Sequence, residues 1–181
     1  MDRPMIQFPL AERYLAIRPE AMGRSEDLEV ALTTLVLQAR AAHPGIAVDP
    51  GTFVDFLATR LPIDLCEHHL ADLYLACACA VGAPNAAARL EELCISQVGK
   101  AIGRIDHSAM FVAEIQQRTR EKLLVGGADG RPRIAEYGAR GSLAAFVRVS
   151  AIREGLASSA SDHVEPGNPP PNGGPVGATT T

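Results

Sequence analysis

Residues 110–156 read MFVAEIQQRTREKLLVGGADGRPRIAEYGARGSLAAFVRVSAIREGL, and this stretch decides the fold. Apolar residues recur at helical spacing on both sides of a Gly-rich turn at residues 126–130. Ser108 and Ser142 precede the two periodic segments, and serine is a preferred N-cap residue. We therefore expect a helix capped by Ser108 with apolar positions from Phe111 to Leu123, one helical turn at residues 131–137, and a final helix capped by Ser142 that ends near Leu156.

The second half of this stretch is basic. Between residues 131 and 153 five arginines stand against Glu136, a local charge of +4 in a chain of net charge −4. The candidate nucleic-acid contacts are Arg131, Arg133, Tyr137, Arg140, Arg148 and Arg153. About four phosphate contacts to a single strand would give a salt slope of roughly −3. A solubilising surface is the alternative for the arginines, and packing in the core is the alternative to base stacking by Tyr137.

The helix expected at residues 109–124 carries a long polar face of mixed charge. The candidate docking residues on that face are Glu114, Gln117, Arg118, Glu121 and Lys122. Their spacing brings them together on one side of a helix, where they suit either water or a charged helical partner.

Upstream, further helices follow from local signals. Ser25 is expected to cap a helix that ends near His43, and Asp49-Pro50 opens a short helix that ends before Pro62. Asp64 and Glu67 have capping-box spacing ahead of an apolar run to Cys79, which predicts a central helix buried on most sides. Asn85 is expected to cap a helix whose apolar positions continue to Ile102.

The composition indicates an all-α protein. The chain has 181 residues, of which 47% are hydrophobic and only 4% aromatic, and Ala and Leu dominate over β-branched residues. Residues 157–181 contain five Pro and four Gly but no Lys or Arg, which predicts a disordered tail. We expect a helical N-terminal extension over residues 1–62, a helical domain over 63–156 and the tail over 157–181.

Several classes of function are disfavoured. No apolar run reaches the length of a membrane span, and the N-terminus does not resemble a signal peptide, so we expect a cytoplasmic protein without membrane contact. The four cysteines are expected to be reduced and buried, with a metal site at Cys66, His68 and His69 as the weaker alternative. Residues 126–130 lack the Lys-Ser/Thr of a phosphate loop, and His107 beside Asp106 is read as turn chemistry, so we expect neither an enzyme nor a cofactor.

Residues 70–156 also resemble a known family. The segments that carry this resemblance are ADLYLACACAVG at 71–82, EIQQ at 114–117, EKLL at 121–124, IAEY at 134–137, RGSL at 140–143 and FVRV at 146–149. Together they resemble region two of bacterial RNA polymerase sigma factors, in particular an extracytoplasmic-function-like group of myxobacterial type. Residues 49–62 are similar to the N-terminal extension of that group.

The resemblance implies a sigma region-two helical bundle that docks on the clamp helices of the largest subunit of RNA polymerase core and contacts the promoter −10 element. An anti-sigma factor is a further candidate partner. Phe146 stands where the family usually has Trp, Arg153 falls near a frequent Asn, and no region-four module for the −35 element follows. Two functions stay open: an initiation factor, or a divergent interaction protein that docks on polymerase or on a regulator without promoter recognition.

Overall fold

The computed structural model describes residues 9–21, 24–60, 69–126 and 130–162, and these residues form an all-α fold without a strand. The N-terminal helices are α1 (Pro9–Ile17), α2 (Ser25–Ala42) and α3 (Pro50–Ala58). The others are α4 (Leu70–Ala80), α5 (Ala86–Leu93), η3 (Ile95–Val98), α6 (Gly99–Ile102), α7 (Ala109–Leu124), η4 (Arg133–Glu136) and α8 (Leu143–Asp162). The predicted fold class is therefore confirmed.

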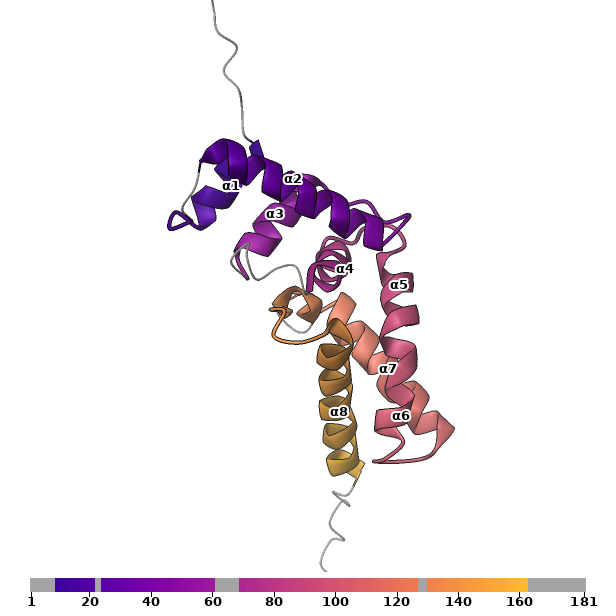
Figure 1. The fold of residues 1–181 in the computed structure, drawn as a ribbon. Helices are drawn as coiled ribbons and strands as arrows, with labels where there is room; N and C mark the ends of the chain where they lie inside the picture. Colours follow the sequence, from indigo (N-terminus) through magenta and orange to yellow (C-terminus); the bar gives the residue numbers. More distant parts are fainter. Residues whose placement is uncertain (1–8, 22–23, 61–68, 127–129, 163–181) are drawn as a thin grey trace, which may run out of the picture.

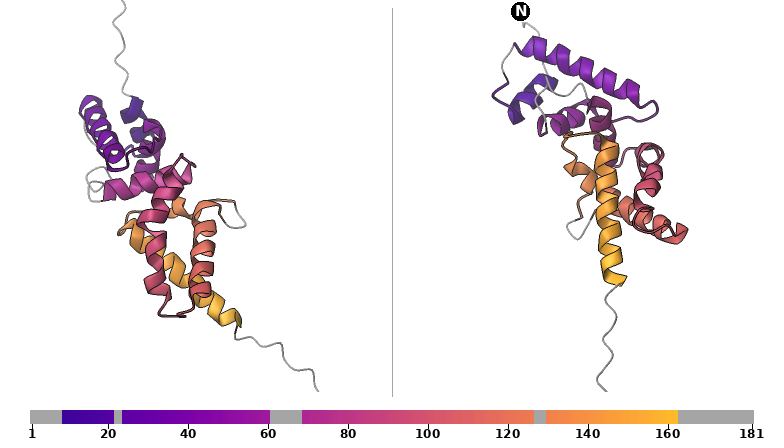
Figure 2. Two further views of the ribbon diagram at one scale, coloured as in Figure 1. Left: turned by 90° about the vertical axis from the view of Figure 1, so that its right-hand side faces the viewer. Right: turned by 60° about the horizontal axis from the view of Figure 1, so that its bottom comes forward.

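Helix α4 lies at the centre of the molecule. Its residues from Leu73 to Cys79 are all buried, as the apolar run predicts. It contacts α2 and α3 on one side and α5, α8 and η4 on the other. Figure 1 shows the consequence: α2 and α3 lie along one side of α4, α1 packs against α2 and α3, and α5 to α8 extend away on the other side. Both views in Figure 2 agree with this arrangement.

Three of the predicted helix starts are confirmed in detail. The Asp49 carboxylate accepts a hydrogen bond from the Thr52 amide at 2.8 Å, and Pro50 occupies the first turn of α3. Ser108 Oγ accepts from the Phe111 amide at 3.2 Å. Ser142 Oγ accepts from the Ala145 amide at 3.2 Å. These caps succeed as predictions because each depends on residues within three positions along the chain.

Two other predicted caps are wrong. Helix α2 begins at Ser25 itself, so Arg24 takes the N-cap position and supplies no side-chain hydrogen bond. Asn85 does precede α5, but it lies in the left-handed region at φ 67° and its side chain caps nothing. Its Nδ2 instead donates to the Gly45 carbonyl oxygen at 3.1 Å, so a long-range contact replaces the local one. The predicted capping box at Asp64 and Glu67, like Pro62, lies outside the described residues.

The continuous helix expected after Asn85 is interrupted at Cys94, where φ is −125°. The chain continues as η3 and α6. This break turns Ile95 and Val98 toward α7 and α8, where both are buried. Gly99 then allows close approach of α7, because a Cβ at this position would lie 3.3 Å from Val112 Cγ1.

Helix α8 is longer than expected and continues to Asp162, so the predicted disordered tail is wrong for residues 157–162. Ser158 is buried, and Arg118 on α7 donates from Nη1 to Ser158 Oγ at 3.2 Å. Packing against α7 thus supports a segment whose composition alone favours disorder. The rest of the predicted tail, residues 163–181, lies outside the described part of the chain.

The N-terminal helices share one buried core with the rest of the protein. A single apolar cluster runs from Tyr14 on α1 to Ala151 on α8. On α2, Glu29 accepts hydrogen bonds from the Leu10 and Ala11 amides at 3.0 and 2.7 Å and so caps α1. The predicted division at residue 62 lies outside the described residues.

The described cysteines are free thiols in the core. Burial raises the pKa of Cys77 and of Cys79 to about 12 and that of Cys94 to about 11. Because the folded state binds these protons more tightly than the unfolded state, the thiols stabilise the fold below the unfolded pKa of about 8.5. That stability is lost as the pH rises from there toward the folded pKa values.

We therefore expect the free energy of unfolding to fall above pH about 8.5 by about 1.4 kcal/mol per pH unit for each of these thiols. Urea denaturation at a series of pH values measures the slope. The variant Cys77→Ala should show a shallower slope than the wild type over the same range. Equal slopes in the two proteins would contradict a raised pKa at Cys77.

Candidate functional site

The loop between η4 and α8 is held in shape by buried polar contacts. Tyr137 Oη donates to the Gly141 carbonyl oxygen at 2.6 Å and lies 3.5 Å from Asp72 Oδ2. The same Asp72 carboxylate accepts from the Leu143 amide at 2.8 Å, at the positive N-terminal end of α8. Helix α4 therefore sets both the path of this loop and the start of α8.

The connection from α7 to η4 begins at a position that requires glycine, Gly126. Its φ is +100°, and a Cβ there would come within 2.6 Å of the Arg131 backbone. Only glycine fits such a left-handed position at so close an approach. The backbone of residues 126 and 131 is thereby brought together at the entry to η4.

A groove of about 610 Å³ lies between α8 on one side and η4 with the loop that follows it on the other. Its lining includes three arginines, one acid and three apolar residues: Arg133, Arg140, Arg153, Glu136, Ala145, Phe146 and Val149. Arg133 Nε is 3.4 Å from Glu136 Oε2. The groove thus combines a net positive charge with aromatic and aliphatic side chains.

The structure brings only part of the predicted basic set together. Arg133, Arg140 and Arg153 line the groove, whereas Arg131 and Arg148 do not. Arg148 is exposed on α8, five residues before Arg153 and therefore about 140° around the helix from it. Of the five arginines that cluster in the sequence, only three line the groove in the folded protein.

The predicted exposure of Tyr137 for base stacking is wrong. The residue is 2% exposed, and its hydroxyl is already used inside the loop. Burial, followed by the nearby Asp72 carboxylate, raises the pKa of Tyr137 above its ordinary value, so the phenol stays protonated. Packing, the alternative that the sequence left open, is the role the structure supports.

A second aromatic residue that lines the groove is Phe146, on α8. Its ring packs edge-on against Tyr137 at a centroid distance of 5.7 Å. Phe146, Val149 and Arg153 share one side of α8 at i, i+3 and i+7 spacing, and all three line the groove. That spacing is visible in the sequence, but it does not say which side of the helix faces the core.

The predicted docking residues on α7 fall into two sets. Glu114, Gln117 and Glu121 lie exposed along the helix. Arg118 is exposed as well, but it also contacts Ser158 on α8, and the half-buried Lys122 forms an ion pair with Glu154 through its Nζ. Arg118 also pairs with Glu114 at 2.6 Å.

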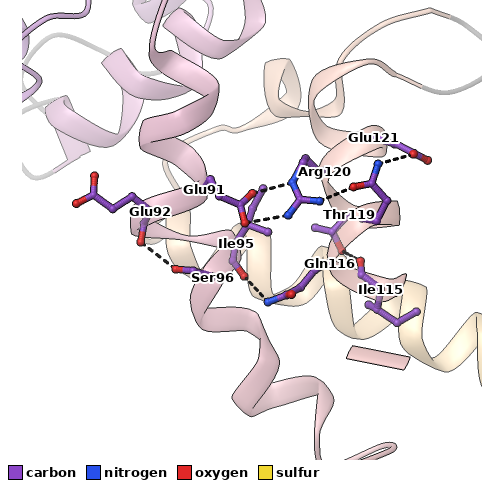
Figure 3. Close-up of polar contacts among 10 residues, drawn as sticks. Glu91, Glu92, Ile95, Ser96, Ile115, Gln116, Thr119, Arg120 and Glu121 are labelled. Carbon is purple, nitrogen blue, oxygen red and sulfur yellow. Dashed lines mark hydrogen bonds and ion pairs between the residues drawn. The ribbon is translucent and has the colours of Figure 1, made fainter. Parts of the chain in front are cut away.

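Arg120, which sequence reasoning did not select, begins a chain of contacts that extends to Glu121 of the exposed set (Figure 3). Its guanidinium makes a two-point contact with the Glu91 carboxylate on α5, at 2.8 and 2.9 Å. Nη1 of Arg120 also donates to Gln117 Oε1, and Gln117 Nε2 donates to Glu121 Oε1 at 2.7 Å. Because a two-point arginine–carboxylate contact is geometrically specific, Gln117 and Glu121 are presented in a defined arrangement.

The described residues contain no group of three or more His, Cys, Asp or Glu side chains arranged to hold a metal ion. Of the residues in the alternative metal site, Cys66 and His68 lie outside the described part of the chain. Among the described helices, none combines the length and the apolar character that crossing a bilayer requires.

Comparison of the chain with protein-family models, with curated proteins and with solved structures gives no match.

Proposed function

We propose that the protein is a sigma-like transcription initiation factor that binds RNA polymerase core through α7 and contacts the melted promoter −10 element in the groove. The observation that carries the proposal is the groove itself, which is lined by Arg133, Arg140, Arg153 and Phe146. This combination of cations and an aromatic ring suits a single nucleic-acid strand. The resemblance of residues 70–156 to sigma region two supports the same function.

The charge distribution is consistent with contacts to phosphates at one place. The whole chain has a net charge of −4, so bulk attraction to nucleic acid is weak. Three arginines in the groove would give a salt slope of roughly −2 on single-stranded DNA. That value is smaller than the slope expected for the linear arginine patch.

The aromatic ring of Phe146 adds a second kind of contact to the groove. Stacking of a base on an aromatic side chain is worth about 1–3 kcal/mol and tolerates different bases. Phe146 is only partly buried, and its ring is supported by Tyr137 from behind. A base entering the groove would therefore meet a ring whose orientation is already restricted.

Polymerase docking is assigned to the exposed set on α7. Glu114, Gln117 and Glu121 present one uncharged and two acidic side chains to a partner. Clamp helices with basic and polar residues would match this surface, and charge complementarity chiefly improves the association rate and the choice of partner. An anti-sigma factor could cover the same surface and thereby block docking. This function would place the protein in the cytoplasm.

The test is retention of the protein on immobilised RNA polymerase core. The wild type should bind, and the double variant Gln117→Ala/Glu121→Lys should bind at least about tenfold more weakly because one contact is lost and one charge reversed. Gln38→Ala/Glu26→Lys makes the same changes at exposed positions on α2 and should bind normally. Absence of wild-type binding to core would overturn the proposal.

A second function is favoured by the contact between Arg133 and Glu136. This contact offsets part of the positive charge of the groove and weakens it as a site for DNA. The protein would then dock on polymerase or on a regulator without recognising a promoter. Transcription from a promoter by core together with this protein alone would exclude this function, whereas core binding without initiation would favour it.

A further inference from the structure

Arg60 links the N-terminal helices to the groove. It follows the last turn of α3, yet its Nε donates to the Tyr137 carbonyl oxygen at 2.9 Å and its Nη2 donates to the Ala135 carbonyl oxygen. Its Nη1 donates back to the Phe56 carbonyl oxygen at 2.6 Å and to Thr59 Oγ1 at 2.7 Å. One guanidinium therefore joins α3 to a segment more than seventy positions further along the chain.

The surroundings of Arg60 explain why an arginine suits this place. The carbonyls it contacts lie at the C-terminal ends of α3 and η4, where helical dipoles concentrate negative charge. Its Cζ also lies 3.3 Å from the centroid of the Phe56 ring. Burial lowers the pKa of Arg60, but an arginine pKa starts so high that the group stays charged at neutral pH.

The carbonyls that Arg60 contacts belong to the wall of the groove. Tyr137 lines the groove, and Ala135 lies between the lining residues Arg133 and Glu136. The backbone hydrogen bonds of η4 are short-range: the Ala135 amide donates to the Pro132 carbonyl oxygen, and the Tyr137 amide donates to the Ile134 carbonyl oxygen. A single helical turn is marginal by itself, so its geometry depends on contacts from outside.

We infer that Arg60 is a positioning residue for the groove and that the helices α1 to α3 serve to hold it against η4. The N-terminal extension is then part of the machinery that shapes the groove. For its effect on nucleic-acid binding this inference rests on the proposed function, but its structural part stands independently.

Arg18 provides a matched control. Its Nε donates to the Ala58 carbonyl oxygen at 2.6 Å, and its Nη1 contacts Glu20, so it also binds the end of α3 through a guanidinium. Among the described residues, its hydrogen bonds reach Ala58 and Glu20 and none reaches η4. A loss of Arg18 should disturb the N-terminal helices without changing the groove wall.

The experiment compares hydrogen exchange in the full-length wild type, Arg60→Met, Arg60→Lys and Arg18→Met. Loss of charge-assisted bonds should accelerate exchange of the Ala135 and Tyr137 amides at least about tenfold in Arg60→Met. Arg60→Lys keeps the charge but cannot span the same carbonyls, so it should give a smaller acceleration. Unchanged exchange at η4 in both Arg60 variants, or equal acceleration in Arg18→Met, would overturn the inference. If Arg60→Met fails to fold, Arg60→Lys decides the result.

Single-stranded DNA binding is measured on the same proteins. At a temperature where all are folded, Arg60→Met should bind more weakly than Arg18→Met, even if the two variants lose equal stability, with partial recovery in Arg60→Lys. If the wild type binds no DNA while η4 exchange responds to Arg60, the proposed function fails and the positioning role stands. If DNA binds equally well to all variants despite faster η4 exchange, Arg60 does not position the groove for DNA.

Discussion

Replacing Tyr74 with alanine is expected to lower the free energy of unfolding by about 3–5 kcal/mol. Tyr74 is 1% exposed on α4 and packs edge-on against Phe53 of α3 at a centroid distance of 5.1 Å. It also stacks against His43, which follows α2, at 6.3 Å. The substitution removes a large ring from the place where three helices meet. Domains of ordinary stability lose a large fraction of their folded population from such a change.

Tyr74→Phe separates the ring from its hydroxyl. Oη accepts a hydrogen bond from the Val48 amide at 3.1 Å and donates to the Ile46 carbonyl oxygen at 3.2 Å. Loss of these bonds alone should cost about 1–2 kcal/mol. Urea denaturation monitored by circular dichroism measures both variants. A loss of less than about 1 kcal/mol in Tyr74→Ala would contradict the central packing role of this ring.

Reversing Arg140 and Arg153 together to glutamate is expected to weaken single-stranded DNA binding at least about tenfold and to reduce the salt slope by about 1.4. Both arginines line the groove, and neither forms an ion pair with another described residue. Each reversal removes one phosphate contact and adds repulsion from the strand. Fluorescence anisotropy of a labelled oligonucleotide at several salt concentrations measures both quantities.

Arg148→Glu is the matched control for this prediction. It makes the same change of charge on the same helix, at an exposed position outside the groove. Its binding should stay within a few-fold of the wild type, because long-range attraction is screened beyond about 10 Å at moderate salt. An equal loss in Arg148→Glu would favour the linear basic patch over the groove.

Local sequence signals predicted most of the helices. Asp49, Ser108 and Ser142 cap helices as expected, since a cap depends on the identity of one side chain and on an amide a few positions away. The burial of α4 also followed from its apolar run. For the same reason the all-α class could be predicted without any knowledge of packing.

The errors arise where distant segments meet. Asn85 binds Gly45 instead of capping α5, and residues 157–162 remain helical beside Arg118. Tyr137 lines the groove but is only 2% exposed, and its hydroxyl contacts Asp72 of α4 and the Gly141 carbonyl oxygen. Gly45, Ser158 and Asp72 each lie forty or more positions from the residue they contact, so spacing along the chain does not reveal these pairs.

The sequence by itself determined that the chain is helical, where most helices begin, and that positive charge is concentrated after residue 130, because propensity, capping and charge are properties of neighbouring residues. The tertiary structure decided which side of α8 faces the groove, which three arginines meet there with Phe146, and that Arg60 supports the groove from α3. These features depend on how helices pack around α4. Packing is set by contacts between residues far apart in the chain, which no local pattern contains.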